Sequence, residues 1–340
     1  MIDKMPAKAP DKAPAKIINR QLIAKPVANE LKQFEDDFAR TLHSEIPLLQ
    51  SAIEQVLRSN GKHIRPLLLL LTAKACGVPT RMTQEAAVII ETLHTTTLIH
   101  DDVVDETKQR RGRPSLNAIF DNRIAVLTGD YLLSGTILNA AETGNIVIIK
   151  TIARVCRELS EGELLQIENT EKRSLDENEY LLMIRKKTAT LLSACSEIGA
   201  ITVGAPPELI QKCRIFGEYL GYCFQIKDDI FDYYDDVNIG KPTGNDIREG
   251  KITLPLLHAL KNAPENERSI YLEIIDNQNY TTQNVNALIQ FAKQYGGIAY
   301  AERRLLDYKQ KAVEIINSFP ESEARHSLLL LADYFTERTH

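Results

Sequence analysis

The sequence predicts an all-α protein, and three observations support that prediction. Apolar residues recur at intervals of three and four along most of the chain, which is the spacing of one helix face. Leu, Ile and Ala dominate, whereas aromatic residues make up 6% and Trp is absent, a balance that favours helices over strands. No Gly/Pro/Ser-rich linker divides the 340 residues. We therefore expect one large helical domain with an extensive apolar core.

The predicted elements begin after a short N-terminal arm. Residues 1–16 repeat Pro, Ala and Lys without apolar periodicity, which indicates a disordered arm. Helical periodicity starts at about residue 28 and continues to 58, where Asn60-Gly61 ends it. Further helices are expected at 67–76, 83–106, 115–140, 145–169, 176–203 and 206–236. The glycine-rich segment 238–251 reads as a loop, after which helices resume with a break at Gly296-Gly297.

Two acidic motifs with one spacing end two of these helices. Asp101 and Asp105 lie four residues apart in His-Asp-Asp-Val-Val-Asp-Glu, and Asp228 and Asp232 repeat the spacing. On a helix, this spacing puts both carboxylates on one face. Acidic groups at a helix C-terminus face the negative end of the helix dipole, and the first motif also lies among apolar residues. A solvated helix end is the simplest explanation of such acids, but a bound divalent cation would remove both costs.

Clusters of Lys and Arg accompany the acidic motifs. Lys62 and Arg65 lie three apart at a predicted helix start, where unpaired backbone N–H groups favour anions. Arg110 and Arg111 suit phosphate, because one guanidinium can bind two phosphate oxygens. The loop 238–251 also contains lysines, although it lacks the spacing of a P-loop. Taken singly, each cluster is equally compatible with a solvated turn or with local charge balance.

The composition argues against several classes of function. The net charge is -5 and the pI about 5.9, without an extended basic face, so nucleic acid is not an expected partner. Five scattered cysteines without a Cys-x-x-Cys pair argue against zinc and disulfides and favour a cytoplasmic location. The apolar run from Leu67 to Ala73 is too short to span a membrane, and no secretory signal is predicted. Peripheral contact with a membrane surface stays compatible with this pattern.

Together these features indicate one kind of chemistry. Carboxylates bind Mg²⁺, which proteins typically hold through one or two carboxylates plus substrate phosphates. Cationic side chains bind phosphate oxygens, and apolar helices supply a pocket without water. Such a site favours a substrate with a diphosphate at one end and a hydrocarbon at the other. The expected reaction is departure of diphosphate from an allylic carbon, with the metal stabilising the leaving group and the pocket protecting the carbocation from water.

Six segments then occur in the order typical of the trans-prenyl diphosphate synthase family: GKHIRP, LIHDDVVDE, RRG, KTA, FQIKDDIFDYYDD and GKPTGNDIREGKITLP. From about residue 28 onward, the chain resembles the long-chain polyprenyl branch of that family, the octaprenyl diphosphate synthases in particular. The resemblance implies an isoprenoid synthase-type fold with a central cavity, with residues 17–340 as the catalytic domain, and a homodimer. It also implies Mg²⁺-dependent condensation of isopentenyl diphosphate with an allylic diphosphate such as farnesyl or geranylgeranyl diphosphate.

The resemblance further implies roles for individual residues. Magnesium on the allylic diphosphate would be held by Asp101, Asp105 and Asp228, with support from Asp102 and Asp232. The same diphosphate would be bound by Arg110, Lys187, Lys241 and Lys251. The metal-free isopentenyl diphosphate site would comprise Lys62, Arg65, His94 and Arg111. Thr188 and Gln225 would stabilise the carbocation with oxygen dipoles, and the departing diphosphate would take the proton.

Two of these assignments compete with simpler interpretations. A single histidine on an apolar helix is usually a core residue, but His94 lies two turns before Asp101, which favours a role as a ligand. Lys187 lies within an apolar helical stretch, where a lysine can also extend its amine to the surface.

Product length is predicted from two small residues. Thr97 and Thr96 lie four and five residues before Asp101, where a Phe or Tyr would close the pocket after a few isoprene units. With threonines there, we expect a channel that continues toward Leu93 and Ile89. This predicts a long-chain product of about the octaprenyl class, which would serve as a quinone side chain.

Two other functions share some of these features. A class I terpene cyclase also uses an aspartate-rich helix and magnesium, but it pairs the helix with an Asn/Ser/Glu motif and would lack the cations at 62–65. A non-catalytic partner subunit usually loses its acidic motifs, whereas both are intact here. An assay of the isolated chain with both substrates separates the three hypotheses.

Overall fold

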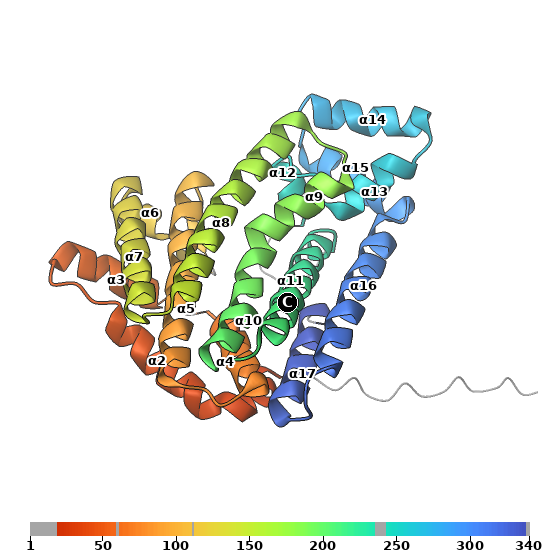
Figure 1. Ribbon diagram of the computed structural model, residues 1–340. Helices are drawn as coiled ribbons and strands as arrows, with labels where there is room; N and C mark the ends of the chain where they lie inside the picture. Colours follow the sequence, from red (N-terminus) through yellow and green to blue (C-terminus); the bar gives the residue numbers. More distant parts are fainter. Residues whose placement is uncertain (1–18, 59–60, 111, 235–242, 338–340) are drawn as a thin grey trace, which may run out of the picture.

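The computed structural model describes residues 19–58, 61–110, 112–234 and 243–337, and they form a helical assembly (Figure 1). Its first half contains α1 (Arg20–Ala24), η1 (Lys25–Val27), α2 (Ala28–Thr41), α3 (Pro47–Arg58), α4 (Ile64–Cys76), α5 (Arg81–Val104), α6 (Leu116–Ile119), α7 (Asn122–Glu142) and α8 (Ile146–Lys172). Its second half contains α9 (Glu177–Ile184), η2 (Arg185–Ala189), α10 (Thr190–Thr202), α11 (Pro207–Phe231), α12 (Asn245–Arg248), α13 (Leu254–Asn262), α14 (Glu265–Asp276), α15 (Thr282–Gln294), α16 (Gly297–Asn317) and α17 (Glu323–Glu337).

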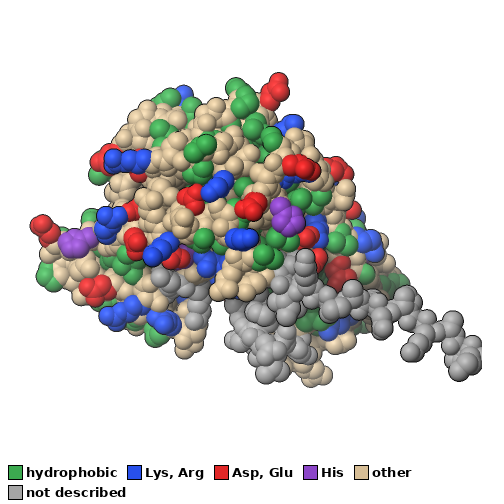
Figure 2. Space-filling view, turned by 90° about the horizontal axis from the view of Figure 1, so that it is seen from below, with side chains coloured by type: hydrophobic (Ala, Val, Ile, Leu, Met, Phe, Trp, Pro, Cys, Tyr) green, Lys and Arg blue, Asp and Glu red, His purple; other side chains and the backbone are tan. Residues whose placement is uncertain are grey.

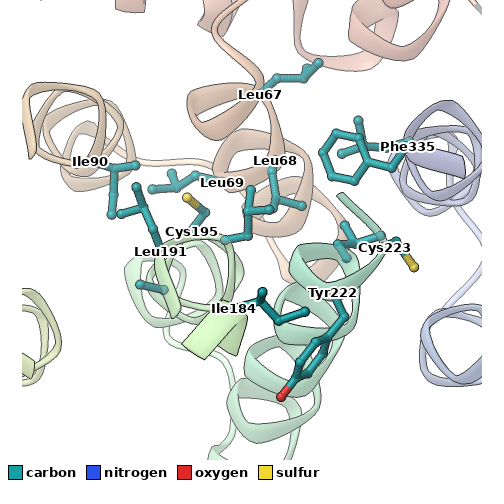
Figure 3. Close-up of a cluster of buried hydrophobic side chains, with 14 of the residues drawn as sticks. Leu67, Leu68, Leu69, Ile90, Ile184, Leu191, Cys195, Tyr222, Cys223 and Phe335 are labelled. Carbon is teal, nitrogen blue, oxygen red and sulfur yellow. The ribbon is translucent and has the colours of Figure 1, made fainter. Parts of the chain in front are cut away.

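The core is centred on α10, which packs against α4, α5, α8 and α11. Every residue of α4 from Leu67 to Leu71 is fully buried, because the helix has neighbours on several sides. Figure 3 shows Leu67, Leu68 and Leu69 of α4 together with Leu191 of α10 and Phe335 of α17. Each such side chain contributes about 1.5–3 kcal/mol by leaving water. This core fixes α5 and α11, the two helices that end in the acidic motifs.

The helical prediction is confirmed, but several elements differ from their expected boundaries. The expected helix 115–140 is divided into α6 and α7, and the expected helix 176–203 is interrupted by η2. The expected helix 28–58 is divided into α2 and α3, because Leu42 leaves helical geometry (φ -87°, ψ 80°) and Pro47 starts a new helix. The expected helix 206–236 ends at Phe231. The described chain also contains one antiparallel hairpin, β1 (Gln109–Arg110) and β2 (Arg113–Pro114), which is too short to produce alternating hydrophobicity. The arm 1–16 lies outside the described residues.

One helix presents large apolar side chains to solvent. On α7, Leu127 is 66% exposed and Leu138 59% exposed, and Tyr131 and Ile137 are also exposed. By length and composition α7 is apolar enough to cross a membrane, although its other side packs on α5. We call these four residues the outer α7 face. Figure 2, which views the protein from below, shows side chains of both charges intermixed with apolar ones across the surface.

Candidate active site

The first acidic motif occupies the C-terminal end of α5. Asp101 is partly buried on the last turn, and its carbonyl accepts a hydrogen bond from the Asp105 amide at 2.8 Å. Burial raises the pKa of Asp101 to about 6, with Lys187 lowering it and the Glu163 carboxylate raising it further. A partly buried carboxylate beside a second one is stabilised by added positive charge. This end of α5 therefore favours a cation.

The adjacent Asp102 is buried and has a protein partner. Nε and Nη2 of Arg110 both lie 2.8 Å from Oδ1 of Asp102, and Asn117 Nδ2 donates to the Asp102 carbonyl at 3.0 Å. Burial raises the pKa of Asp102, and Arg110 opposes the rise. This ion pair ties the β-hairpin to the end of α5. Arg110, predicted to bind the allylic diphosphate, contacts the first motif directly, whereas the predicted ligand Arg111 lies outside the described residues.

The second motif ends α11 and is organised around a different aspartate. Asp228 is exposed, whereas Asp229 is buried and accepts hydrogen bonds from Tyr180 OH at 2.6 Å and from Gln225 Nε2 at 2.8 Å. Burial raises the pKa of Asp229 to about 8, and the nearby Asp246 carboxylate adds to the rise. Neutral donors thus hold this carboxyl group in place without removing the cost of its charge.

Asp232 closes the second motif by capping a short helix. One carboxylate oxygen of Asp232 accepts from the Asn245 amide at 2.8 Å and the other from the Asp246 amide at 3.1 Å. These amides begin α12, so Asp232 satisfies backbone groups that the helix itself leaves unpaired. Each carboxylate oxygen has a second lone pair, so the capping role is compatible with the predicted role in metal binding. The predicted ligand Lys241 lies outside the described residues.

The catalytic pair predicted at 187–188 lies on η2, a π-helical turn between α9 and α10. Glycines on both sides let neighbouring helices approach this turn. A Cβ at Gly162 would lie 2.5 Å from the Lys187 amide, and one at Gly221 would lie 2.3 Å from the Ala189 Cα. Single π-turns within helices are frequent at functional sites, because the widened turn redirects side chains. Here the turn places Lys187 beside α8 and Thr188 beside α11.

Thr188 and Gln225, to which the resemblance assigns one role, are in contact. Thr188 Oγ1 donates to Gln225 Oε1 at 2.7 Å, and Gln225 Nε2 continues to Asp229. Lys187 Nζ lies 2.9 Å from Gln166 Oε1 and 2.5 Å from Glu163 Oε2. The two helices α8 and α11 thus orient the two residues of the π-turn from opposite sides.

A polar cavity of about 170 Å³ joins these groups to the loop after α11. Among its lining residues are Lys187, Thr188, Gln225, Asp229, Asp246 and Lys251. Burial lowers the pKa of Lys251, but the Glu249 carboxylate and the charges of Asp246 and Asp105 outweigh it and hold that pKa above its usual range. Asp105 belongs to the first motif, and Asp229 of the second motif lines the same cavity as Lys251. Lys251 thus lies close to the ends of both acidic helices.

A second cavity of about 440 Å³ continues from the first motif between α5, α7 and α8. Asp101 and Lys187 line it, as do Thr96, Thr97, Leu93, Leu133 and Leu159. The Thr96 hydroxyl donates to the Thr92 carbonyl at 3.0 Å and the Thr97 hydroxyl to the His94 carbonyl at 2.8 Å. Because both hydroxyls are satisfied within their own helix, these threonines add little polarity to the wall. Both predicted product-length residues thus line an apolar cavity that begins at the acidic motif.

The predicted isopentenyl residues surround the start of α4. Lys62 is exposed with Nζ 3.3 Å from Tyr334 OH, and Arg65 lies on the first turn of the helix. His94 is buried on α5 and lines a smaller cavity, of about 80 Å³, together with Asp102 and Arg110. The two interpretations of His94 are therefore compatible, since it is largely buried and also borders a cavity next to the first motif.

The donor set suits a hard divalent cation. Within the described ranges, no group of three or more His, Cys, Asp or Glu side chains is close enough to hold a metal ion alone. Carboxylate oxygens at Asp101 and Asp105 nevertheless fit Mg²⁺, which usually takes its remaining ligands from water and substrate phosphates. The partly buried Asp101 carboxyl group, with its raised pKa, marks where positive charge is needed.

Several residues of the site were not assigned from the sequence. Glu163 and Gln166 orient Lys187, and Tyr180 orients Asp229. The sequence gives little indication of these roles, because isolated polar residues on amphipathic helices are usually solvated. Asp246 lines the polar cavity. Its position in the glycine-rich loop was the feature of the sequence that indicated a place in the site.

The chain matches known proteins over most of its length. The family model described as Polyprenyl synthetase matches residues 46–292. The chain is 35% identical to the all-trans-nonaprenyl-diphosphate synthase (geranyl-diphosphate specific) of Rhodobacter capsulatus, over 94% of this chain and 98% of the relative.

Solved structures agree with this match. A polyprenyl synthase from Caulobacter crescentus complexed with calcium and isoprenyl diphosphate aligns with a TM-score of 0.89 and 29% identity, covering 96% of this chain and all of that one. A geranylgeranyl pyrophosphate synthase from Bacteroides thetaiotaomicron aligns with a TM-score of 0.81 and 40% identity, covering 94% and 99%. The chain belongs to the polyprenyl synthetase family and is a prenyltransferase with the all-helical fold of these synthases.

Proposed function

We propose that the protein condenses isopentenyl diphosphate with an allylic diphosphate in a magnesium-dependent reaction and extends it to a long all-trans chain. The position of Lys187 is the observation that supports this most strongly. It lines both the polar cavity, with Thr188, Gln225 and Lys251, and the apolar cavity that contains Thr96. A substrate with a diphosphate head and a hydrocarbon tail matches that arrangement.

The described residues divide the work of such a reaction. Lys187 and Lys251 bind diphosphate oxygens, since both amines line the polar cavity. Magnesium, when bound at the aspartates, stabilises the charge on the leaving group. Thr188 and Gln225 line the polar cavity and would stabilise the cationic carbon with their oxygen dipoles, while the apolar wall excludes water.

The length of the product is part of the proposal. Identity alone does not distinguish the classes, because the relatives above include a nonaprenyl and a geranylgeranyl enzyme. The open cavity beyond Thr96 and Thr97 supports a long chain, such as the side chain of a quinone. Chromatography of the hydrolysed product, made by the purified chain from farnesyl diphosphate, isopentenyl diphosphate and Mg²⁺, tests both the activity and the length. Absence of any prenylated product would refute the proposal.

We further propose that the enzyme works as a homodimer paired through the outer α7 face. This face exposes Leu127, Tyr131, Ile137 and Leu138 on one helix, and a second copy offers the same apolar surface. Burial against that copy removes these side chains from water. The double variant Leu127→Asp, Leu138→Asp should sediment as a monomer under conditions in which the native chain sediments as a dimer. A native chain that sediments as a monomer would contradict the proposal.

The proposed location is the cytoplasm, with peripheral membrane contact for release of the apolar product. All five cysteines are free thiols, which suits a reducing compartment. Exposed Leu164 and Ile167 border the apolar cavity and offer a place for lipid contact. Vesicle flotation after a round of synthesis, with and without substrates, tests this part of the proposal.

A further inference from the structure

The irregular turn before α4 is joined to α5 by a buried polar contact. His63 Nδ1 lies 3.0 Å from Glu91 Oε1, and both side chains are 8% exposed. An ionised carboxylate has only acceptor sites, so the imidazole Nδ1 is the donor. The second carboxylate oxygen, Oε2 of Glu91, is buried and has no hydrogen-bond partner within the described part of the chain. The contact with His63 thus fixes one oxygen of a carboxylate whose other oxygen is buried without a hydrogen bond in the described part of the chain.

The surroundings of His63 hold this contact in one geometry. The residue has a left-handed backbone, with φ 44° and ψ 43°, and directly precedes α4. Its ring packs edge-on against Phe34, with centroids 5.3 Å apart, and against Phe38 at 6.1 Å. A non-glycine residue in this conformation persists when its side chain makes compensating contacts. The turn is therefore fixed by α2 from one side and by α5 from the other.

The neighbours of the pair are the residues assigned to isopentenyl diphosphate. Lys62 adjoins His63 in the chain, and Arg65 lies two residues beyond it on the first turn of α4. His94 follows Glu91 by three residues, so both lie on one face of α5. The hydrogen bond thus connects the segment containing Lys62 and Arg65 to the helix containing His94. The same cavity is lined by His63, Glu91 and His94.

We propose that His63 and Glu91 are a positioning pair, which sets the distance between Lys62 and Arg65 on one side and His94 on the other. The proposal rests on the function proposed above. Neither residue needs to touch the diphosphate. Cationic ligands bind phosphate oxygens well only when held at the correct separation, so a looser turn weakens this site. Neither residue lines the polar cavity of Lys187 and Lys251 or the apolar cavity behind Asp101.

Substitution of His63 tests the pair without backbone strain. His63→Gly retains the left-handed turn and removes the ring, whereas His63→Asn tolerates the same backbone and offers an amide N–H near the position of Nδ1. We expect His63→Gly to raise KM for isopentenyl diphosphate about tenfold, the size expected for one lost buried hydrogen bond. KM for the allylic diphosphate should stay within about twofold, and His63→Asn should restore most of the loss.

The partner residue provides an independent variant, in case His63→Gly fails to fold. Glu91→Met conserves volume inside α5 and removes the acceptor, and it should give the same rise in KM for isopentenyl diphosphate. If the two residues act through one contact, the double variant should be no worse than the more affected single variant. Thr83→Ala is the matched control, because it removes a buried hydrogen bond of 2.9 Å to Thr202 at the far end of α5. It should lower Tm and leave both KM values unchanged.

The outcomes separate this inference from the proposed function. A native chain that makes no prenylated product would refute the proposed function itself. An active native chain, with an unchanged KM for isopentenyl diphosphate in Glu91→Met, would overturn the positioning role alone. Equal rises in both KM values, or a similar rise in Thr83→Ala, would also overturn it, because general destabilisation would then explain the effect.

Discussion

The two acidic motifs have the same spacing, yet the structure surrounds them differently. In the first, the middle aspartate, Asp102, is buried against the charged Arg110. In the second, the corresponding Asp229 is buried against the neutral donors Tyr180 and Gln225. The leading aspartates also differ, because Asp101 is partly buried beside an apolar cavity whereas Asp228 is exposed.

This difference indicates that the two motifs have different roles. The first motif has an apolar cavity behind it, so it suits the end of the substrate where the hydrocarbon begins. The second motif is joined to α12 by the cap that Asp232 makes, so it helps to fix the loop that contains Lys251. The two motifs therefore offer the same carboxylate ligands but bury them to different extents. The elements packed around each motif determine this difference.

The largest expected effect is on catalysis at the leading aspartates. Asp101→Asn should lower kcat about a thousandfold, because stabilisation of leaving-group charge by a metal contributes several kcal/mol. The equivalent Asp228→Asn should lower kcat as well, by about a hundredfold, since its exposed carboxylate is less desolvated. Steady-state assays at saturating Mg²⁺ measure both. A neutral outcome for either variant would remove that motif from the metal site.

Two adjacent lysines provide the next test. Lys187→Gln should lower kcat about a hundredfold, because Lys187 lines both cavities and is proposed to bind the diphosphate. Lys186 is the matched control, since it pairs with Glu161 on α8 and lines neither of these two cavities. Lys186→Gln should retain near-native kcat in the same assay. Equal losses in both variants would show that the turn requires only general positive charge.

Equivalent positions on α5 and α11 test the apolar cavity. Thr96 lies five residues before Asp101, and Cys223 lies five before Asp228. Thr96→Phe should shorten the product, because the ring enters the cavity, whereas the isosteric Thr96→Val should preserve its length. Cys223 is fully buried in the core, so Cys223→Met should cost about 1–3 kcal/mol of stability and leave product length unchanged. An unchanged product distribution in Thr96→Phe would refute the channel route.

Stability without metal should depend on pH in a direction set by two buried carboxyl groups. The pKa values of Asp101 and Asp229 are raised from 3.8 to about 6 and about 8, so the folded state binds more protons than the unfolded state between these limits. Stability should therefore fall as pH rises from about 4 to 8. Asp101→Asn should increase the free energy of unfolding at pH 7.5 by at most about 3 kcal/mol, and Tm should rise accordingly.

The equivalent substitution in the second motif is the control for this effect. Asp228 is exposed, so Asp228→Asn should leave Tm within experimental error. Asp229→Asn should flatten the pH dependence most clearly between about pH 6 and 8, where Asp101 has already ionised and Asp229 still keeps its proton. Thermal melts in EDTA across pH 5–9 measure all three variants. A native Tm that increases over this range would contradict the assigned pKa directions.

Much of the fold and of the site was predictable from sequence, for physical reasons that particular residues illustrate. The end of α5 follows from helical periodicity that runs into acidic residues. The resemblance implied one role for Thr188 and Gln225, but their hydrogen bond depends on packing between η2 and α11 and was not predicted. The split of the helix 28–58 was missed, because Leu42 and Ile46 continue the apolar spacing across the break. The π-turn at Lys187 was not predicted, since it depends on close approach to Gly162 and Gly221.

Binding of Mg²⁺ in the presence of a non-reactive allylic diphosphate analogue tests the central claim most directly. Titration calorimetry on the native chain should show magnesium binding that depends on the analogue, as expected where phosphates complete the metal ligands. Asp101→Asn and Asp228→Asn should each weaken that binding at least tenfold. If both variants bound Mg²⁺ and the analogue as tightly as the native chain, the claim that the two helix ends share one metal-diphosphate site would be contradicted.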